Sequence, residues 1–360
     1  MEVEERDRRT VGILLLNLGG PDSLNAVRPF LYNLFSDREI IKLGPLFLQK
    51  PLARMISIIR SAKSSKMYDL IGGKSPINDI TRAQADALEI ALNQGVEYRS
   101  ENRENPPQPP FNKGGLEISI PSPAFKVYMG MRYWHPFIKD VVRQIFDDGI
   151  RQLIVLSLYP HYSKTTTGSS IAEFKRAIEV FKVHGARFTV KYIDQWYDHP
   201  LYIDSLAEVI GQGITDLRGD DFTLLYSAHG LPKSIIEHGD PYLEHIKTTI
   251  ELTNKRLSEV PYNLPGLRWS LSFQSRTGPV EWLAPSTDQA IEKFSGEGVK
   301  NLLVVPISFV SDHVETLYEI DILFKDLAKR LGIDLKRCRS LNTSDRFIAV
   351  LKELVMEKVN

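Results

Sequence analysis

Cysteine is almost absent from this 360-residue chain, in which Cys338 is the only one. One thiol forms no internal disulfide, and it is too few for a zinc knuckle or an iron–sulfur cluster. An excess of charge of one sign is also lacking, because 45 Lys and Arg stand against 45 Asp and Glu. Nucleic-acid-binding proteins need a basic surplus. We therefore expect a protein of the reducing cytoplasm that binds no nucleic acid.

Long hydrophobic runs are missing as well. The apolar stretch Val11–Leu16 near the start is far shorter than the ~20 residues that a membrane-spanning helix needs. A segment of mixed charge precedes it, unlike the basic-then-apolar pattern of a signal peptide. Nucleotide motifs are incomplete too: Gly73-Lys74-Ser75 has Tyr68 where a phosphate loop requires glycine. These absences disfavour a membrane protein and an ATPase.

What the sequence does contain is a set of short apolar runs that end in Gly, Pro, Ser or His and are followed by helical patterns. They are Val11–Asn17, Lys126–Met131, Leu153–Leu158, Phe222–Ser227, Trp269–Phe273 and Asn301–Ile307. Fully apolar short strands alternating with helices are typical of parallel sheets buried on both faces. Ligands bind at the carboxyl ends of such strands. The sequence therefore predicts two α/β halves that face each other across one cleft.

The repeat of this pattern predicts two domains, residues 1–200 and 201–332. Residues 333–360, a short strand and a final helix over Arg346–Lys358, are predicted to pack back onto the first domain. The segment 99–124 is rich in proline and polar residues, which cannot offset their ordering entropy by burial. We predict that it is a disordered surface insertion.

Several residues at the predicted strand ends carry chemistry. His229 follows a strand and precedes Gly230, where it is either a reactive group in the cleft or a histidine bonded to a turn. Glu315 and Glu319 are four residues apart and share a helix face, with Asp312 and His313 at the start of that helix. A histidine with carboxylates suits a divalent cation or proton transfer. The alternative for the carboxylates is a solvated helix end.

Aromatic residues also gather near the predicted strand ends, where they suit a flat apolar ligand. A separate stretch, residues 43–60, is apolar along one side and basic at its end. Two interpretations fit this stretch. It is either a helix buried against the protein or an exposed lip that contacts lipid or a hydrophobic ligand.

Eight motifs in fixed order span nearly the whole chain. They are LNLGGPDS (16–23), YDLIGGKSPI (68–77), MGMRYWHP (129–136), LYPHYSKTTTGSS (158–170), YSAHGLP (226–232), GDPY (239–242), SFQSRTGPVEWL (272–283) and SFVSDHVETLYEID (308–321). With these motifs the chain resembles the ferrochelatases, in their bacterial and cyanobacterial form without an iron–sulfur cluster. Members of that family insert ferrous iron into a porphyrin, with release of two protons.

The resemblance implies an α/β fold of two Rossmann-like domains, each with a parallel four-stranded sheet flanked by helices, and an active cleft between them that binds a distorted porphyrin. It implies that His229 and Glu315 are catalytic and face the porphyrin from opposite walls. Two assignments fit the sequence equally well: His229 accepts a pyrrole proton, or His229 binds the metal and Glu315 is the base. The porphyrin-binding residues that it implies are Asn17, Leu18, Tyr68, Ser75, Arg132, Tyr133 and Trp282. The residues that it implies along the metal path are His229, Glu315, Glu319, Asp312 and His313.

Ferrous iron is then a substrate, and we expect no permanently bound cofactor. The sequence ends at Asn360 without the cysteine-bearing or membrane-helical extension of some relatives. Leu18 replaces the tyrosine of coproporphyrin-using relatives, which favours protoporphyrin IX as substrate. The alternatives are a coproporphyrin III ferrochelatase and a non-catalytic porphyrin or haem carrier. A monomer and a homodimer both stay open, as does peripheral membrane contact through residues 43–60.

Overall fold

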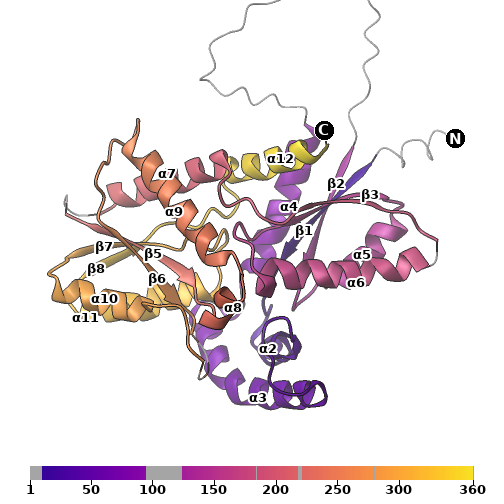
Figure 1. Cartoon of the computed structure of the whole chain (residues 1–360), viewed down its shortest axis with the longest axis horizontal. Coiled ribbons are helices and arrows are strands. Elements are labelled where there is room, and N and C mark those ends of the chain that lie inside the picture. Colours follow the sequence, from indigo (N-terminus) through magenta and orange to yellow (C-terminus); the bar gives the residue numbers. More distant parts are fainter. Residues whose placement is uncertain are drawn as a thin grey trace, which may run out of the picture.

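A computed structural model describes residues 10–94, 124–183, 185–217, 221–276, 278 and 280–359. The predicted proline-rich insertion at 99–124 lies outside these ranges, apart from Ala124. The described residues form two four-stranded sheets, with every strand pair parallel and helices packed on both faces (Figure 1). The predicted fold class is thereby confirmed.

The first sheet has the strand order β2-β1-β3-β4. Its strands are β1 (Val11–Asn17), β2 (Phe125–Met131), β3 (Gln152–Ser157) and β4 (Thr189–Ile193). All seven residues of β1 are buried, because the strand is central and helices cover both faces. β4 lies at the edge, and its residues 189–192 are exposed or half-buried. This edge strand has no continuous apolar run, and the run-based prediction missed it.

The second sheet repeats the arrangement, with the order β6-β5-β7-β8. Its strands are β5 (Thr223–His229), β6 (Trp269–Gln274), β7 (Asn301–Val305) and β8 (Asp334–Arg337). The assignment of residues 333–337 to the first domain was wrong. β8 pairs in parallel with β7, because Ile333 and Leu335 bury their side chains in the apolar core between this sheet and its helices.

Helices fill the connections between the strands. The helices are α2 (Val27–Ser36), α3 (Leu46–Leu70), α4 (Ile77–Asn93), α5 (Ile138–Asp147), α6 (Ser169–Val183), α7 (Pro200–Thr215), α8 (Lys233–Glu237), α9 (Tyr242–Ser258), α10 (Thr287–Gly296), α11 (Lys325–Arg330) and α12 (Asp345–Val359). A short 3₁₀ turn, η1 (Leu24–Ala26), precedes α2. Two π-helical segments, η2 (Lys164–Gly168) and η3 (Glu315–Phe324), precede α6 and α11.

One apolar core continues through both halves of the molecule. Its buried residues include Ile13 of β1, Tyr226 of β5 and Leu303 of β7. The C-terminal helix α12 bridges the two halves, because it packs against α4 of the first half and against α7. The shared core holds the two sheets in one arrangement, so that residues at their strand ends meet.

Helices α2 and α3 form an arm that extends from the two sheets in Figure 1. The inner residues of the arm pack against Tyr133 and Trp134, which follow β2, and Val314 adjoins the same cluster. The outer face of α3 carries exposed apolar side chains, among them Leu46, Phe47 and Ile59. No helix of the described residues combines the length and hydropathy that a bilayer crossing needs.

Candidate active site

A cavity of about 110 Å³ lies where the carboxyl ends of the two sheets face each other. Asn17, Leu18 and Leu158 line it from the first sheet, and His229 and Glu315 line it from the second. One apolar core includes residues of both sheets and therefore holds their strand ends on either side of the same cavity. The predicted cleft between two domains is thus present.

His229 is the last residue of β5, and two neighbours fix its backbone there. Its N–H donates to Ser308 Oγ at 2.9 Å, and its carbonyl accepts from the Tyr242 hydroxyl at 3.1 Å. The imidazole Nδ1 lies 2.8 Å from Oε2 of Glu315. The other ring nitrogen, Nε2, has no hydrogen-bond partner among the described residues, and 35% of the side chain is exposed. The ring is therefore oriented by a carboxylate and offers Nε2 to the cleft.

This contact corrects one expectation. The resemblance implied that His229 and Glu315 face the porphyrin from opposite walls, whereas the two side chains are in direct contact on the same wall. The reason is topological. β5 and β7 are neighbouring parallel strands, so His229 at the end of β5 lies beside the segment after β7 that carries Glu315.

A second hydrogen-bonding group connects Glu315 to Glu319. Both glutamates lie on η3, and Ser275 Oγ is 2.7 Å from one oxygen of each carboxyl group. Gln274 supports the same pair, because its side-chain amide donates to the Glu315 carbonyl at 2.9 Å and to Glu319 at 3.2 Å. A serine hydroxyl has one proton to donate. Two such short contacts therefore require that one carboxyl group holds a proton.

Burial and mutual charge decide which group holds it. Burial raises the pKa of Glu315, but the charge and hydrogen bond of His229 outweigh burial and hold that pKa well below its usual value. Burial also raises the pKa of Glu319, and the negative charge of Glu315 raises it further, to about 7. Burial lowers the pKa of His229, but Glu315 more than offsets this and raises it above 6.5. Glu319, and not Glu315, is therefore the carboxyl group that takes up a proton near neutral pH.

The backbone of Ser275 is strained. Its φ of +65° lies in the left-handed region, which residues other than glycine seldom occupy. In this conformation Ser275, which directly follows β6, contacts both carboxyl groups. Ser275 and Gln274 lie within the motif SFQSRTGPVEWL, but the motif itself did not distinguish them as site residues. The only signal for them was a polar pair directly after a predicted strand.

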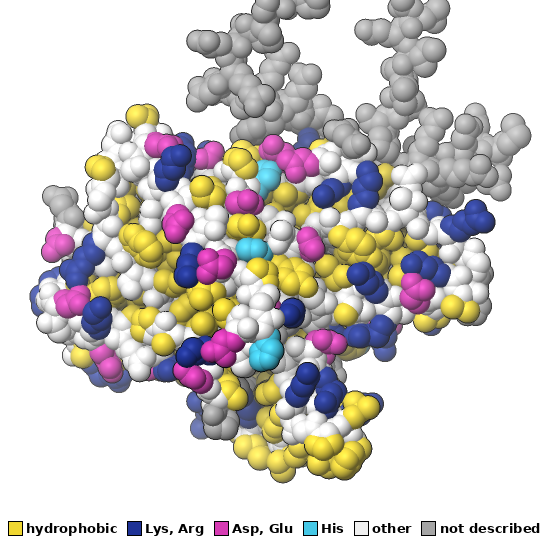
Figure 2. All heavy atoms as spheres, viewed as in Figure 1, with side chains coloured by type: hydrophobic (Ala, Val, Ile, Leu, Met, Phe, Trp, Pro, Cys, Tyr) yellow, Lys and Arg dark blue, Asp and Glu magenta, His cyan; other side chains and the backbone are white. Residues whose placement is uncertain are grey.

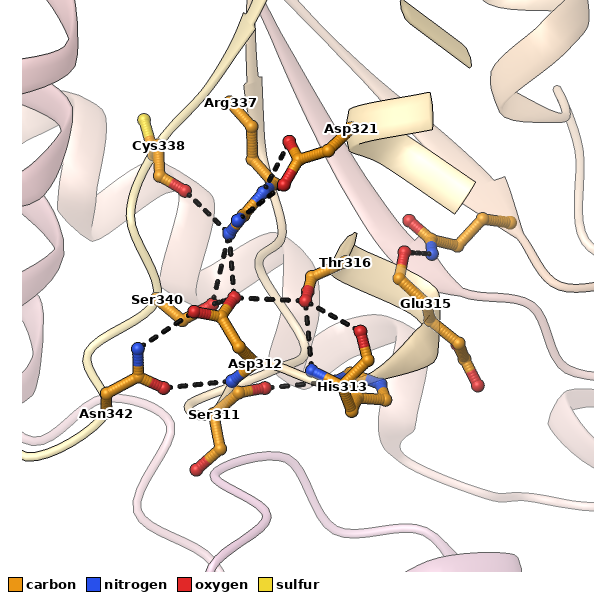
Figure 3. A network of polar contacts seen from close by, with 11 residues as sticks. Ser311, Asp312, His313, Glu315, Thr316, Asp321, Arg337, Cys338, Ser340 and Asn342 are labelled. Atoms are coloured by element: carbon orange, nitrogen blue, oxygen red, sulfur yellow. Dashed lines mark hydrogen bonds and ion pairs between the residues drawn. The ribbon is translucent and has the colours of Figure 1, made fainter. Parts of the chain in front are cut away.

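Asp312 and His313 lie in different surroundings (Figure 3). Asp312 accepts hydrogen bonds from Arg337, Ser340 and Asn342 at 2.8–2.9 Å, and Arg337 also pairs with Asp321. Burial raises the pKa of Asp312, but Arg337 and these hydrogen bonds outweigh it and keep the carboxylate ionised. In the figure, Glu315 lies on the other side of Thr316 from Asp312.

His313 is buried and lines the cleft, unlike Asp312. Its Nδ1 lies 3.0 Å from the Ser311 carbonyl, and its ring packs against Phe309 with centroids 4.4 Å apart. Burial lowers the pKa of His313, so the ring is neutral near pH 7. The structure therefore brings His229, Glu315 and His313 to the cleft. Glu319 lies beside Glu315 and shares the Ser275 hydroxyl with it, and Asp312 belongs to a separate ion-pair network.

Of the first-half residues that the resemblance implied for porphyrin binding, Asn17 and Leu18 line the cleft, whereas Tyr68 and Ser75 do not. Asn17 ends β1, and its side chain donates to Thr81 while accepting from the Leu18 N–H. Tyr68 is buried near the end of α3, and burial together with the Glu315 charge raises its pKa. Ser75 is buried against Gly20, where an added Cβ would lie 2.5 Å from the serine side chain.

Arg132 and Tyr133 converge on a residue that sequence reasoning missed. Asp37, next to the end of α2, accepts from the Arg132 guanidinium and from the Tyr133 hydroxyl, both at 2.7 Å. Ser169, at the start of α6, donates to the same carboxylate at 2.6 Å. This buried cluster ties the arm to the first sheet, and only the tertiary structure reveals it.

Trp282 lies close to His229, the last residue of β5. Its backbone bridges to Pro232, and its ring packs against Gly230, the residue after His229. The indole N–H is buried and finds no acceptor among the described residues. Buried polar groups are normally paired, so this N–H is a candidate donor to a bound ligand.

Comparison with known proteins identifies the family. The family model "Ferrochelatase" matches residues 10–109 and 114–359. A ferrochelatase of Geotalea uraniireducens is 49% identical over 350 residues, which is 97% of this chain and 98% of that protein. A ferrochelatase of Aquifex aeolicus is 43% identical over 97% of this chain and 99% of that protein.

A solved structure supports the fold independently of sequence. SirB from Bacillus subtilis with Fe3+ superimposes with a TM-score of 0.52 at 8% identity, covering 97% of this chain and 95% of that one. At that identity the likeness concerns the fold alone. The full-length match to the family model and the close curated relatives concern the whole chain, which therefore belongs to the ferrochelatase family of metal chelatases.

Proposed function

We propose that this chain inserts ferrous iron into protoporphyrin IX, with His229 Nε2 as the first proton acceptor and Glu315 and Glu319 as the groups that receive the iron. The observation that carries the proposal is the 2.8 Å contact between His229 Nδ1 and Glu315 in the wall of the cleft. It orients the imidazole so that its second nitrogen faces the space where a porphyrin would lie. Sequence alone left open which of the two residues is the base.

Metal insertion must remove two protons from the pyrrole nitrogens. Burial lowers the pKa of His229, but Glu315 outweighs burial and raises it, so the neutral ring is a stronger proton acceptor than a free imidazole. Glu315 stays ionised and stabilises the imidazolium that forms. Glu319, with a pKa of about 7, takes up and releases a proton near neutral pH and provides a route for the released charge.

Iron is a substrate in this reaction and has to leave the protein. Loose ligation by an imidazole and carboxylates suits such transfer better than a closed four-ligand cage. Because the sequence holds one cysteine, Cys338, and this cysteine is buried, we propose that no iron–sulfur cluster takes part.

The choice of protoporphyrin IX rests on the cleft wall. Leu18, Ile77 and Leu158 line it from the first half, and Leu231 and Val310 line it from the second. Vinyl groups, which distinguish protoporphyrin IX, are apolar, whereas the extra propionates of coproporphyrin III are charged and costly to desolvate. An apolar wall favours the vinyl-bearing substrate.

The test is anaerobic metallation of protoporphyrin IX and coproporphyrin III by the purified protein. The loss of porphyrin fluorescence measures the rate. Wild type should metallate protoporphyrin IX faster. His229→Ala should lose about 10²- to 10⁴-fold in rate, the contribution of a positioned base, while His238→Ala, at an exposed histidine of the same domain, should not. Tight porphyrin binding without any metallation would identify a carrier, and preference for coproporphyrin would refute the substrate choice.

We further propose that the outer face of α3 docks on anionic membranes, where poorly soluble porphyrin partitions. Leu46, Phe47 and Ile59 are 75%, 76% and 68% exposed. From Leu46 to Tyr68 the helix has no acidic residue, although it carries several lysines and arginines. A yellow patch marks the arm at the bottom of Figure 2. Each basic residue near an anionic surface contributes roughly 1 kcal/mol.

Co-sedimentation tests the docking. Vesicles of phosphatidylcholine with phosphatidylglycerol should retain the protein at low salt and release it at high salt, and vesicles of phosphatidylcholine alone should not retain it. Phe47→Glu should abolish retention, whereas Val183→Glu, at an 82% exposed valine on α6, should not. Retention unaffected by Phe47→Glu would rule out this face. Dimerisation that Phe47→Glu disrupts would assign the face to a second copy instead.

A further inference from the structure

A histidine and two glutamates converge outside the cleft, on the helical layer that joins the two sheets. His199 directly precedes α7, and Glu353 and Glu357 lie four residues apart on α12, on one face of that helix. One nitrogen of His199 and one oxygen of each carboxylate all lie within 4.8 Å of one another. None of the three residues lines the cleft.

His199 is unusual within this group because its ring is largely buried but forms no side-chain hydrogen bond in the described part of the chain. Only 9% of its side chain is exposed, and its Nδ1 is buried without a partner in the described part of the chain. Its Nε2 faces Glu357 Oε1 at 3.7 Å, which is too long for a hydrogen bond. Buried imidazole rings normally form hydrogen bonds, so a ring that forms none and directs Nε2 toward Glu357 indicates a missing ligand between the ring and the carboxylates.

The chemistry of the three groups identifies that partner. An imidazole nitrogen with two carboxylate oxygens suits a borderline transition metal such as Zn²⁺, Fe²⁺ or Co²⁺, whereas Mg²⁺ and Ca²⁺ prefer sites made only of oxygen. Ligand atoms around such an ion lie about 3 Å apart, given metal–ligand bonds of about 2.1 Å. The two glutamates are exposed and can rotate by the small distance needed. Three protein ligands leave one position for water.

We propose that His199, Glu353 and Glu357 form a second site for a divalent transition metal, separate from the cleft where iron is inserted. The bound ion would hold α12 against the first turn of α7. Since α7 leads from the first sheet into the second and α12 packs on both α7 and α4, the ion would stabilise the arrangement of the two halves. Binding to the folded state alone raises stability by mass action.

Zinc alone, without porphyrin, is the probe. Equilibrium dialysis of the wild-type protein should show two bound zinc ions, one in the cleft and one at the new site. Each single ligand variant should weaken zinc binding at the new site by more than the 10–100-fold that follows from losing an outer-shell partner. The variants are His199→Gln, Glu353→Gln and Glu357→Gln. Glu244→Gln is the matched control, because it removes an exposed carboxylate of α9 and should change neither site.

A second measurement separates the two sites. In a His229→Ala protein, zinc should still raise the melting temperature, and adding Glu353→Gln should remove that rise. Metallation of porphyrin by the Glu353→Gln single variant should equal that of wild type, which also shows that this exposed substitution leaves the fold intact. Equal zinc binding by wild type and all three ligand variants would overturn the proposal. A zinc-induced rise in melting temperature that survives in the double variant would overturn it as well.

Discussion

Glu315 and Glu319 lie on the same π-helical segment and share the hydroxyl of Ser275, yet replacing them by glutamine should change stability in opposite directions. Glutamine keeps the shape of the side chain and its hydrogen-bond acceptor while it removes the charge. Burial and the neighbouring carboxylate raise the pKa of Glu319, whereas His229 outweighs burial and lowers the pKa of Glu315. The environment therefore opposes the negative charge of one glutamate and favours that of the other.

The magnitude follows from the pKa of Glu319. A group whose pKa is raised on folding stabilises the protein below its unfolded pKa, and this contribution is lost as the pH rises through its folded pKa. The difference between 4.5 and about 7 corresponds to about 3 kcal/mol, at 1.36 kcal/mol for each pH unit. Glu319→Gln should therefore stabilise the protein by up to about 3 kcal/mol at pH 8 and by under ~1 kcal/mol at pH 5.

The opposite sign holds for Glu315. Its lowered pKa stabilises the folded state above pH 4.5, and this contribution is lost as the pH falls through its folded pKa. Glu315→Gln should therefore lower stability at pH 8, and the loss should shrink in acid. For a chain of this length 3 kcal/mol corresponds to roughly 4 °C in melting temperature.

Differential scanning calorimetry of wild type, both variants and Glu292→Gln at pH 5 and pH 8 gives the answer. Glu292 is an exposed glutamate of α10 and controls for the loss of one negative charge. The reasoning is refuted if Glu319→Gln lowers the melting temperature at pH 8, or raises it equally at both pH values. Metal insertion should respond differently, since Glu319→Gln should raise the iron concentration needed for half-maximal rate more than it lowers the limiting rate.

Other substitutions test neighbouring parts of the site. His229→Ala should abolish metal insertion while the melting temperature stays within a few degrees of wild type, because the ring is partly exposed; calorimetry beside the metallation assay checks both. Asp312→Asn should lower the melting temperature by leaving the buried Arg337 guanidinium with one ionised partner instead of two, at a cost of about 1–3 kcal/mol, and should affect the iron dependence little. Ser275→Ala should raise the pKa of Glu319 above about 7, since the serine hydrogen bond lowers it, and should move the pH dependence of the iron requirement upward.

The central strands were predictable because each is buried on both faces. β1 and β5 correspond to the predicted runs Val11–Asn17 and Phe222–Ser227, and the structure places Asn17 and His229 at the carboxyl ends of these strands. The four-residue spacing of Glu315 and Glu319 placed them together for an equally local reason. Such features depend on periodicity within one segment, and periodicity is what a sequence displays directly.

The edge strands and the connections between segments were not predictable in this way. β4 has exposed residues and no apolar run, and β8 was assigned to the wrong half because four residues do not show which sheet they join. Whether Asp312 joins the metal path or pairs with Arg337 depends on where β8 lies. Strand pairing of this kind is a long-range choice.

By itself, therefore, the sequence determined the fold class, the cleft at the strand ends and the identity of the histidine and glutamates, since each follows from local patterning or from family motifs. Only the tertiary structure decided that His229 and Glu315, 86 residues apart, touch on one wall, and that Ser275 joins Glu315 to Glu319. The pKa values of the two glutamates differ, and this difference depends on burial and on distances of under 3 Å. Those distances exist only once β5, β6 and the segment after β7 lie side by side in one sheet.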